Sequence, residues 1–226
     1  RCQKDFIAEN IMDLTNHFII AMPGLADPSF SKTVSYICQH DSQGAMGLTI
    51  NRPLDIAFDE LLTQLNIPLD NRSLAATPIY QGGPVDTTHG FILHSNEFNV
   101  PKDKAGDPEK HINSSIENNL AKPAEKKASS HLSQTLKIND YLSVSSSVEI
   151  ISAIARNEGP QKYLITLGYS GWGAGQLERE MSENAWLHVP ADHQIIFDTP
   201  DKLRWETAAK QMGIDIHLIS SESGHA

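Results

Sequence analysis

Cysteine is almost absent from this chain, and this limits the classes of protein to which the chain can belong. Only Cys2 and Cys38 occur among 226 residues. Two thiols cannot staple a domain of this size, and no Cys-x-x-Cys spacing indicates a metal or redox site. Long apolar runs are also missing, since none approaches the roughly 18 residues that suggest a membrane span. The first ten residues lack the apolar centre of a secretion signal. We therefore expect a cytoplasmic protein with reduced thiols and no membrane partner.

Positive charge is scarce as well. Lys and Arg number 18 against 28 Asp and Glu, which gives a net charge of −10. Because binding to phosphates needs a dense basic surface, this balance argues against nucleic acid as a partner. Apolar residues make up 39% of the chain, enough to fill one core.

The distribution of polar residues predicts one domain with an insertion. Residues 12–220 carry the apolar pattern of a single domain, and residues 221–226 form a tail. Residues 1–11 precede the first methionine, and we expect a disordered extension that is either native or left by cloning. Residues 97–131 combine equal numbers of lysines and acids with three prolines and few large apolar side chains. Such a segment buries too little to offset its ordering entropy, so we expect a flexible polar insertion.

Apolar periodicity predicts strands separated by a few helices. The expected strands are 17–22, 32–40, 48–51, 79–81, 90–94, 136–138, 141–145, 163–167, 185–189, 195–197 and 216–219, with Gly44 in a hairpin between the second and third. The expected helices are 56–65, 148–156, 176–184 and 200–212, the last with Thr199 as its N-cap. Helices interspersed among groups of strands predict the α+β class.

The glycine-rich segment 168–175 is the most informative stretch, because it follows a strand and precedes a helix. We expect a tight turn that exposes Trp172, and an exposed Trp on a loop would anchor a protein interface. A phosphate cradle is disfavoured: no Gly-Lys-Ser/Thr ending is present, and Glu178 and Glu180 would repel an anion.

A serine nucleophile is the rival interpretation of this segment. The run from Gly168 to Trp172 nearly matches a Gly-x-Ser-x-Gly elbow around Ser170, but Trp172 stands where the second glycine belongs. A catalytic serine also needs a histidine and an acid, which His188, His193 or His217 could supply only through the fold. The ten histidines show no His-Glu-x-x-His spacing. We therefore predict no catalytic residue, no metal and no cofactor, and the balance leans against an enzyme.

Two polar turn motifs leave two interpretations open. Asn51-Arg52-Pro53 and Gln81-Gly82-Gly83-Pro84 both fall at strand ends. They fit ordinary turn chemistry, or a ligand or partner rim in which Arg52 offers its fork of donors to a carboxylate.

Taken together, several segments resemble the AlgH/YqgE family of bacterial proteins. The segments that carry the resemblance are His17–Pro23, Asp27–Phe30, Gly44–Pro53, Gly82–Val85, Leu167–Trp172, Gly175–Glu178 and Asn184–Trp186. The resemblance implies an α+β fold with a strongly bent, mostly antiparallel sheet arranged as a pseudo-barrel with flanking helices. It implies a cytoplasmic protein without an established activity, and the AlgH name carries a proposed role in regulation.

These observations predict a shared surface site and a leading hypothesis for function. The predicted binding residues are Asn51, Arg52, Gly82, Gly83, Ser170, Gly171, Trp172, Gln176 and Glu178. The leading hypothesis is a non-catalytic cytoplasmic protein that binds a protein partner in a regulatory setting. The alternatives are a small-ligand binder or hydrolase using the Gly168–Gly175 loop, and a transcriptional regulator acting on DNA.

Overall fold

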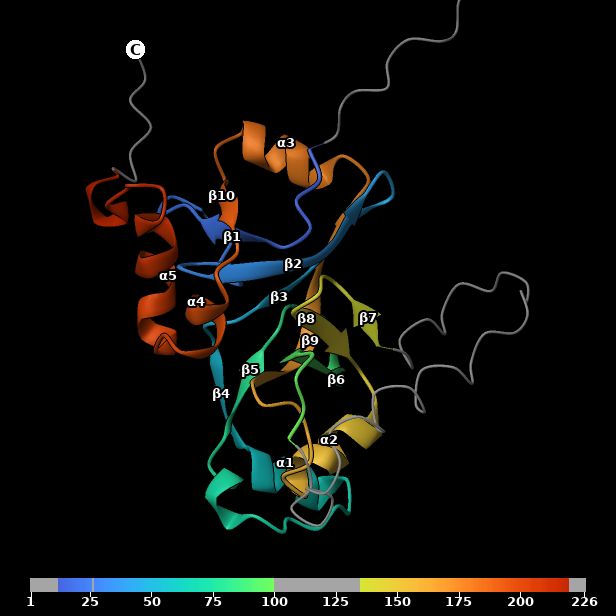
Figure 1. The fold of residues 1–226 in the computed structure, drawn as a ribbon. Helices are drawn as coiled ribbons and strands as arrows, with labels where there is room; N and C mark the ends of the chain where they lie inside the picture. The colour runs from blue at the N-terminus through green and yellow to red at the C-terminus, as the bar shows by residue number, and fades with distance from the viewer. Residues whose placement is uncertain (1–11, 26, 100–134, 220–226) are drawn as a thin grey trace, which may run out of the picture.

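The computed structural model describes residues 12–25, 27–99 and 135–219 (Figure 1). The predicted extension at 1–11, most of the predicted insertion and the tail at 221–226 lie outside these residues. The structure corrects the N-terminal boundary predicted for the insertion, residue 97. Glu97 accepts a backbone hydrogen bond from Gln161, and Phe98 forms a β-bridge with Pro160. Residues 97–99 therefore belong to the folded domain.

One curled sheet of ten strands organises the molecule. The strands are β1 (His17–Ala21), β2 (Val34–Asp41), β3 (Gly44–Thr49), β4 (Pro53–Ala57), β5 (Pro78–Gln81), β6 (Val85–Ser95), β7 (Leu136–Lys137), β8 (Leu142–Ser145), β9 (Tyr163–Gly173) and β10 (Trp186–Pro190). The main path runs β10-β1-β2-β3-β9-β6-β8-β7, with β4 paired to β5. Every pairing is antiparallel except that of β5 with β9. The α+β fold with a bent, mostly antiparallel sheet is confirmed.

The helices gather at different parts of the sheet. They are α1 (Phe58–Gln64), α2 (Val148–Ala155), α3 (Gln176–Ser182), α4 (His193–Phe197) and α5 (Asp201–Lys210), with short 3₁₀ helices η1 (Arg72–Leu74) and η3 (Ile216–Leu218). In Figure 1, α1 and α2 close one end of the molecule, α3 lies at the other, and α4 and α5 flank β1 and β2. The start of α2 follows from sequence, because the side chain of Ser147 caps the backbone N–H of Ile150. Among the described residues, no helix has the length and apolar character needed to cross a membrane.

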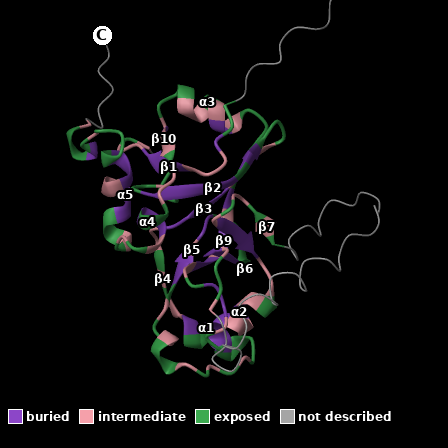
Figure 2. Cartoon of the chain, viewed as in Figure 1, coloured by how far each residue is buried: buried purple, intermediate pink, exposed green. Residues whose placement is uncertain are grey.

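Three apolar clusters fill the space around the sheet, and Figure 2 shows that buried residues are concentrated along the strands. The largest joins β1, β2, β3, β6 and β8 to α4 and α5. A second packs α1 and α2 against β5, β6 and β9. The third is built around Trp172 and Trp186 and holds Leu177 of α3. The second and third clusters involve different stretches of β9, so this strand connects the two ends of the molecule.

Two predicted strands near the C-terminus are wrong. Ile195 and Ile196 lie in α4, because the side chain of Asp192 caps the N–H of Gln194 and both isoleucines still reach the core. Residues 216–218 form η3, where Asp215 caps His217 in the same way. A short apolar run does not distinguish a buried strand from a buried turn of helix.

The start of α5 and the turn at 168–175 also differ from expectation. Pro200 occupies the N-cap of α5, and the Thr199 hydroxyl donates instead to the carbonyl of Gln194. The glycine-rich segment is mostly strand, because β9 continues to Gly173 by pairing with β3. Only Ala174 and Gly175 turn the chain into α3.

Candidate functional site

Trp172 is buried, with 5% of its surface exposed, so the predicted exposed anchor is wrong. Its indole packs edge-on against Trp186 at 5.9 Å and stacks near Phe30. Gly47 makes room for the indole ring, since a Cβ on Gly47 would lie 3.3 Å from Trp172. Alternation along β9 places Trp172 on the inner face and leaves Gly171 and Gly173 exposed. At this end of β9 the exposed residues are therefore Gly171 and Gly173, not Trp172.

A single carboxylate holds the two buried indoles. The N–H groups of Trp172 and Trp186 both donate to Glu180 Oε2, at 3.0 and 2.8 Å. Gln176 donates to the other oxygen at 2.9 Å, and its own amide oxygen accepts the Gly173 N–H at 2.9 Å. Buried indole N–H groups need an acceptor, and an ionised one makes the stronger bond. This network, which we call the Glu180 clamp, fixes α3 to the end of β9.

Ser170 lies in the same stretch of β9 and faces the core. Its side chain is fully buried, and its hydroxyl donates a long bond of 3.4 Å to the Gly82 carbonyl. Within the described residues, no imidazole is hydrogen-bonded to it. The part of the chain that the structure describes therefore places no base on Ser170 of the kind a nucleophilic serine requires.

Gly82 and Gly83 lie where the chain crosses β9. Strands β5 and β6 pair with the same stretch of β9, so they flank it, and only three residues connect them. A Cβ on Gly82 would lie 2.2 Å from the Gly168 carbonyl oxygen, and one on Gly83 2.2 Å from the Tyr169 carbonyl carbon. Gly168 adopts a φ of +72° at the crossing. Two backbones can approach this closely only where side chains are absent.

Asn51 and Arg52 hold the loop that precedes β2. The guanidinium of Arg52 donates to the carbonyls of Ser29 and Pro28, each at 2.7 Å. Asn51 accepts the Val34 N–H and donates to the Lys32 carbonyl, each at 2.9 Å. The donor fork predicted for a ligand carboxylate is engaged with backbone carbonyls.

Glu178 faces the β2–β3 hairpin through a buried histidine. The Leu14 N–H donates to His40 Nδ1 at 3.1 Å, so the proton of the neutral ring resides on Nε2, which donates to Glu178 Oε1 at 2.9 Å. The Glu178 carboxylate remains partly exposed, with 37% of its side chain accessible. It is the member of the predicted set that combines a formal charge with access to solvent on α3.

The fold also assembles a serine–histidine pair that spacing could not reveal. His94 of β6 and Ser145 of β8 lie 2.9 Å apart through Nε2 and Oγ, while His94 Nδ1 lies 2.9 Å from the Ser95 carbonyl oxygen. Burial lowers the pKa of His94 below its ordinary value, which favours the neutral ring. Ser145 is buried, with 1% exposure, and the ring of Phe98 packs edge-on against His94. The pair satisfies two buried polar groups and lacks access for a substrate.

Two clefts open elsewhere on the surface. One of about 180 Å³ lies between α2 and the segment around Tyr163, and one of about 410 Å³ lies between α1 and η1. None of the predicted site residues lines either cleft. No group of three metal-binding side chains occurs in the parts of the chain that the structure describes. The predicted site residues therefore do not form one site. Trp172 and Gln176 belong to the Glu180 clamp, and Asn51 and Arg52 hold the loop before β2. Gly82, Gly83 and Ser170 lie at the crossing of β9, Gly171 is exposed on β9, and Glu178 contacts His40.

These features define an α+β protein with one curled sheet, whose glycine and tryptophan motifs serve its backbone architecture. The chain belongs to the AlgH-like family, whose sequence model matches residues 18–217. It is 42% identical to a UPF0301 protein of Thioalkalivibrio sulfidiphilus, covering 95% of this chain and 97% of the relative. It is 40% identical to a UPF0301 protein of Burkholderia vietnamiensis, with 95% and 96% covered.

Solved structures agree with this assignment. The solution structure of the AlgH protein from Pseudomonas aeruginosa matches with a TM-score of 0.65 and 39% identity, covering 98% of this chain and 100% of that one. A crystal structure of a Corynebacterium diphtheriae protein matches with a TM-score of 0.60 over 91% and 90% of the two chains. Its 14% identity makes it a likeness of fold alone.

Proposed function

We propose that this protein acts in the cytoplasm by binding another protein, without catalysis, and that the binding serves regulation. The surface we assign to this role is the exposed end of β9 with its neighbours, and we call it the α3 surface. It comprises Ser42, Gln43, Gly171, Gly173, Ala174, Gly175 and Arg179, all exposed. Glu178 lies at its border, while Gln176 and Trp172 support it from below.

The Glu180 clamp carries this proposal. Five polar groups of one short segment are paired with one another, which holds the exposed turn in a single conformation. A surface that is rigid before binding loses less entropy on association. A rigid exposed turn built from glycines presents backbone groups, which suits recognition by another polypeptide.

The choice of a protein partner follows from charge and chemistry. A net charge of −10 opposes binding to nucleic acid, so DNA is not the partner we propose. A salt-sensitive mobility shift with duplex DNA at physiological ionic strength would overturn that choice. The cytoplasmic assignment is supported by the buried free thiol of Cys38.

We propose no catalysis because Ser170 and Ser145, the two serines considered as nucleophiles, are both buried. A fluorophosphonate probe should therefore leave Ser170 and Ser145 unlabelled in the native protein. Labelling of Ser145 that disappears in a His94→Ala variant would establish the hydrolase alternative instead.

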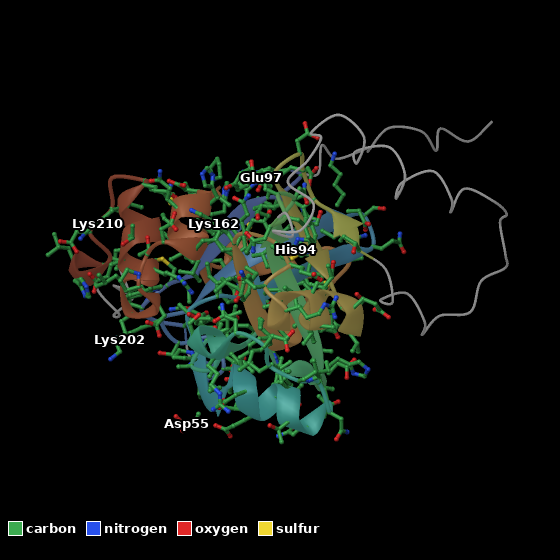
Figure 3. All side chains as sticks on the ribbon, turned by 60° about the horizontal axis from the view of Figure 1, so that its bottom comes forward. Asp55, His94, Glu97, Lys162, Lys202 and Lys210 are labelled. Atoms are coloured by element: carbon green, nitrogen blue, oxygen red, sulfur yellow. The ribbon has the colours of Figure 1, made fainter. Side chains whose placement is uncertain are left out.

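Site-specific crosslinking tests the α3 surface directly. A photoreactive amino acid replaces Ala174 in one variant and Asp55 in another. Asp55 is exposed (Figure 3) and belongs to β4, which lies away from α3 (Figure 1). We expect a discrete crosslinked protein in cells from the Ala174 position and none from Asp55. Identical crosslinks from both positions, or none from Ala174, would contradict the proposed surface.

A further inference from the structure

Strand β9 extends beyond one of its neighbours. Its pairing with β6 ends where Val85 faces Tyr169, and Ser170–Gly173 pair with β3 alone. Every strand has two hydrogen-bonding edges. In the part of the chain that the structure describes, the second edge of Ser170–Gly173 therefore has no partner strand.

Hydrogen bonds of β3 show which amides of β9 lie on that edge. Successive residues of a strand direct their backbone groups to opposite sides. The Thr49 N–H donates to Gly82, on the side of β9, and the Ile50 N–H donates to Val34 of β2. By alternation Ala45 and Gly47 also face β9. They are the partners of Trp172 and Ser170, so the backbone groups of these two residues are used within the sheet.

Gly171 and Gly173 consequently direct their backbone groups away from β3. An independent contact agrees, because the Gly173 N–H donates to the side chain of Gln176 at 2.9 Å. The Gly171 N–H, the Gly171 carbonyl and the Gly173 carbonyl then face the open edge. This arrangement of one donor and two acceptors matches the backbone of an added strand.

The surroundings leave room for such a strand. Both glycines are exposed, so solvent reaches this part of β9. Val85, 38% exposed, offers an apolar contact at one end. The Glu180 clamp fixes the adjoining Trp172, so the edge is held in place before anything binds.

We propose that the Gly171–Gly173 edge accepts an extended, basic segment of a partner protein as an additional strand. This inference rests on the proposed function and names the chemistry of the partner. Main-chain pairing to an exposed edge is an established mode of peptide recognition. Asp86, exposed beside Val85 and hydrogen-bonded to His89, borders one end of the edge. Its charge and the net charge of −10 favour lysine or arginine in the added strand.

A second copy of this chain suits the edge less well. Symmetric pairing of such a short edge would bury far less than the roughly 1,200 Å² of a stable interface. Each copy would also bring a net charge of −10 to the other. The edge is therefore assigned to a different polypeptide.

The test uses the full chain and a synthetic peptide of alternating lysine and valine. Two-dimensional NMR should show the Gly171 amide shifting on addition of the peptide, and its hydrogen exchange slowing. The same peptide methylated on the backbone nitrogens that face the edge should bind at least about fivefold more weakly, because it lacks a main-chain hydrogen bond. A peptide with glutamate in place of lysine should bind at least about fivefold more weakly as well, because it lacks the favourable charge.

Two variants separate the backbone amide from the side chain at this position. Gly171→Ala keeps the N–H and should bind as the parent does. Gly171→Pro removes the N–H, and should fold because proline is tolerated where that group faces away from the sheet, while weakening binding by about five- to tenfold. Unaltered peptide binding to a folded Gly171→Pro protein would overturn strand addition. So would NMR shifts confined to other surfaces when the peptide is added, or the absence of any binding by the lysine–valine peptide. Concentration-dependent shifts of Gly171 without peptide would assign the edge to a second copy instead. None of these results would contradict the α3 surface, which the Ala174 crosslink tests separately.

Discussion

Replacing Glu180 with alanine should destabilise the protein more than its position on a short surface helix suggests. The substitution removes the acceptor of two buried indole N–H groups, at 3.0 and 2.8 Å. A buried donor left without a partner costs about 1–3 kcal/mol. Glu180 is itself only half-buried, so water can reach part of the vacated space. We therefore take the lower part of that range for each indole and expect a loss of about 2–4 kcal/mol in the free energy of unfolding.

Glu180→Gln provides a graded comparison. Its amide oxygen can still accept both indoles, but its NH₂ then faces the NH₂ of Gln176. Turning Gln176 over would relieve that conflict and leave the Gly173 N–H without its acceptor. We expect a loss of about 1 kcal/mol, equivalent to one hydrogen bond.

Urea denaturation followed by far-ultraviolet circular dichroism and tryptophan fluorescence measures these changes. Glu183→Ala is the matched control, because Glu183 lies at the end of the same helix and is exposed. It should change the free energy of unfolding by no more than about 0.5 kcal/mol. If Glu180→Ala costs no more than Glu183→Ala, the carboxylate does not hold the two indoles, and the reasoning about a rigid turn fails.

Three further substitutions test other parts of the structure. Gly83→Ala should prevent stable folding, because its Cβ would lie 2.2 Å from the Tyr169 carbonyl carbon. Gly171→Ala is the control and should leave the thermal midpoint nearly unchanged. Equal midpoints for the two variants would contradict the close approach of Gly83 to β9. Burial lowers the pKa of His94 below 6.5, so the unfolded state binds a proton more readily, and stability should fall as the pH drops below about 6.5. Denaturation between about pH 7 and 5 measures how steeply the free energy of unfolding depends on pH, and this slope should be smaller in His94→Gln. An unchanged slope would exclude His94 as its source. Arg52→Lys keeps the charge but loses the fork, so it should cost about 1–2 kcal/mol and speed amide exchange in the loop before β2; unchanged exchange there would show that the carbonyl contacts do not order the loop.

Local patterns predicted much of the fold. The strand at 17–22 and the helix at 148–156 each match an observed element closely, because a continuous apolar run and a serine cap act within a few neighbouring residues. The run at 195–197 failed, since its apolar residues are buried equally well by a helical turn capped by Asp192. Periodicity reports burial reliably, but a run that short does not define the backbone conformation.

The role of the glycine and tryptophan motifs could not be predicted in the same way. Spacing marked Gly82, Gly83 and Trp172 as unusual, and they do lie near one stretch of β9. The crossing of β9 depends on which strands flank it. This pairing joins residues far apart in sequence, such as Ile79 and Ile165, which are 86 positions apart. The pairing of His94 with Ser145 is equally remote, with 51 positions between them.

By itself the sequence determined the class, the family and most element positions, because these depend on composition and on contacts between near neighbours. The direction of individual side chains was decided only by tertiary structure. Alternation along β9 turned Trp172 inward, and β6 ends early enough that no strand among the described residues lies beside the Gly171 amide. Both outcomes depend on register between distant segments, and a register shift of one residue would have reversed them.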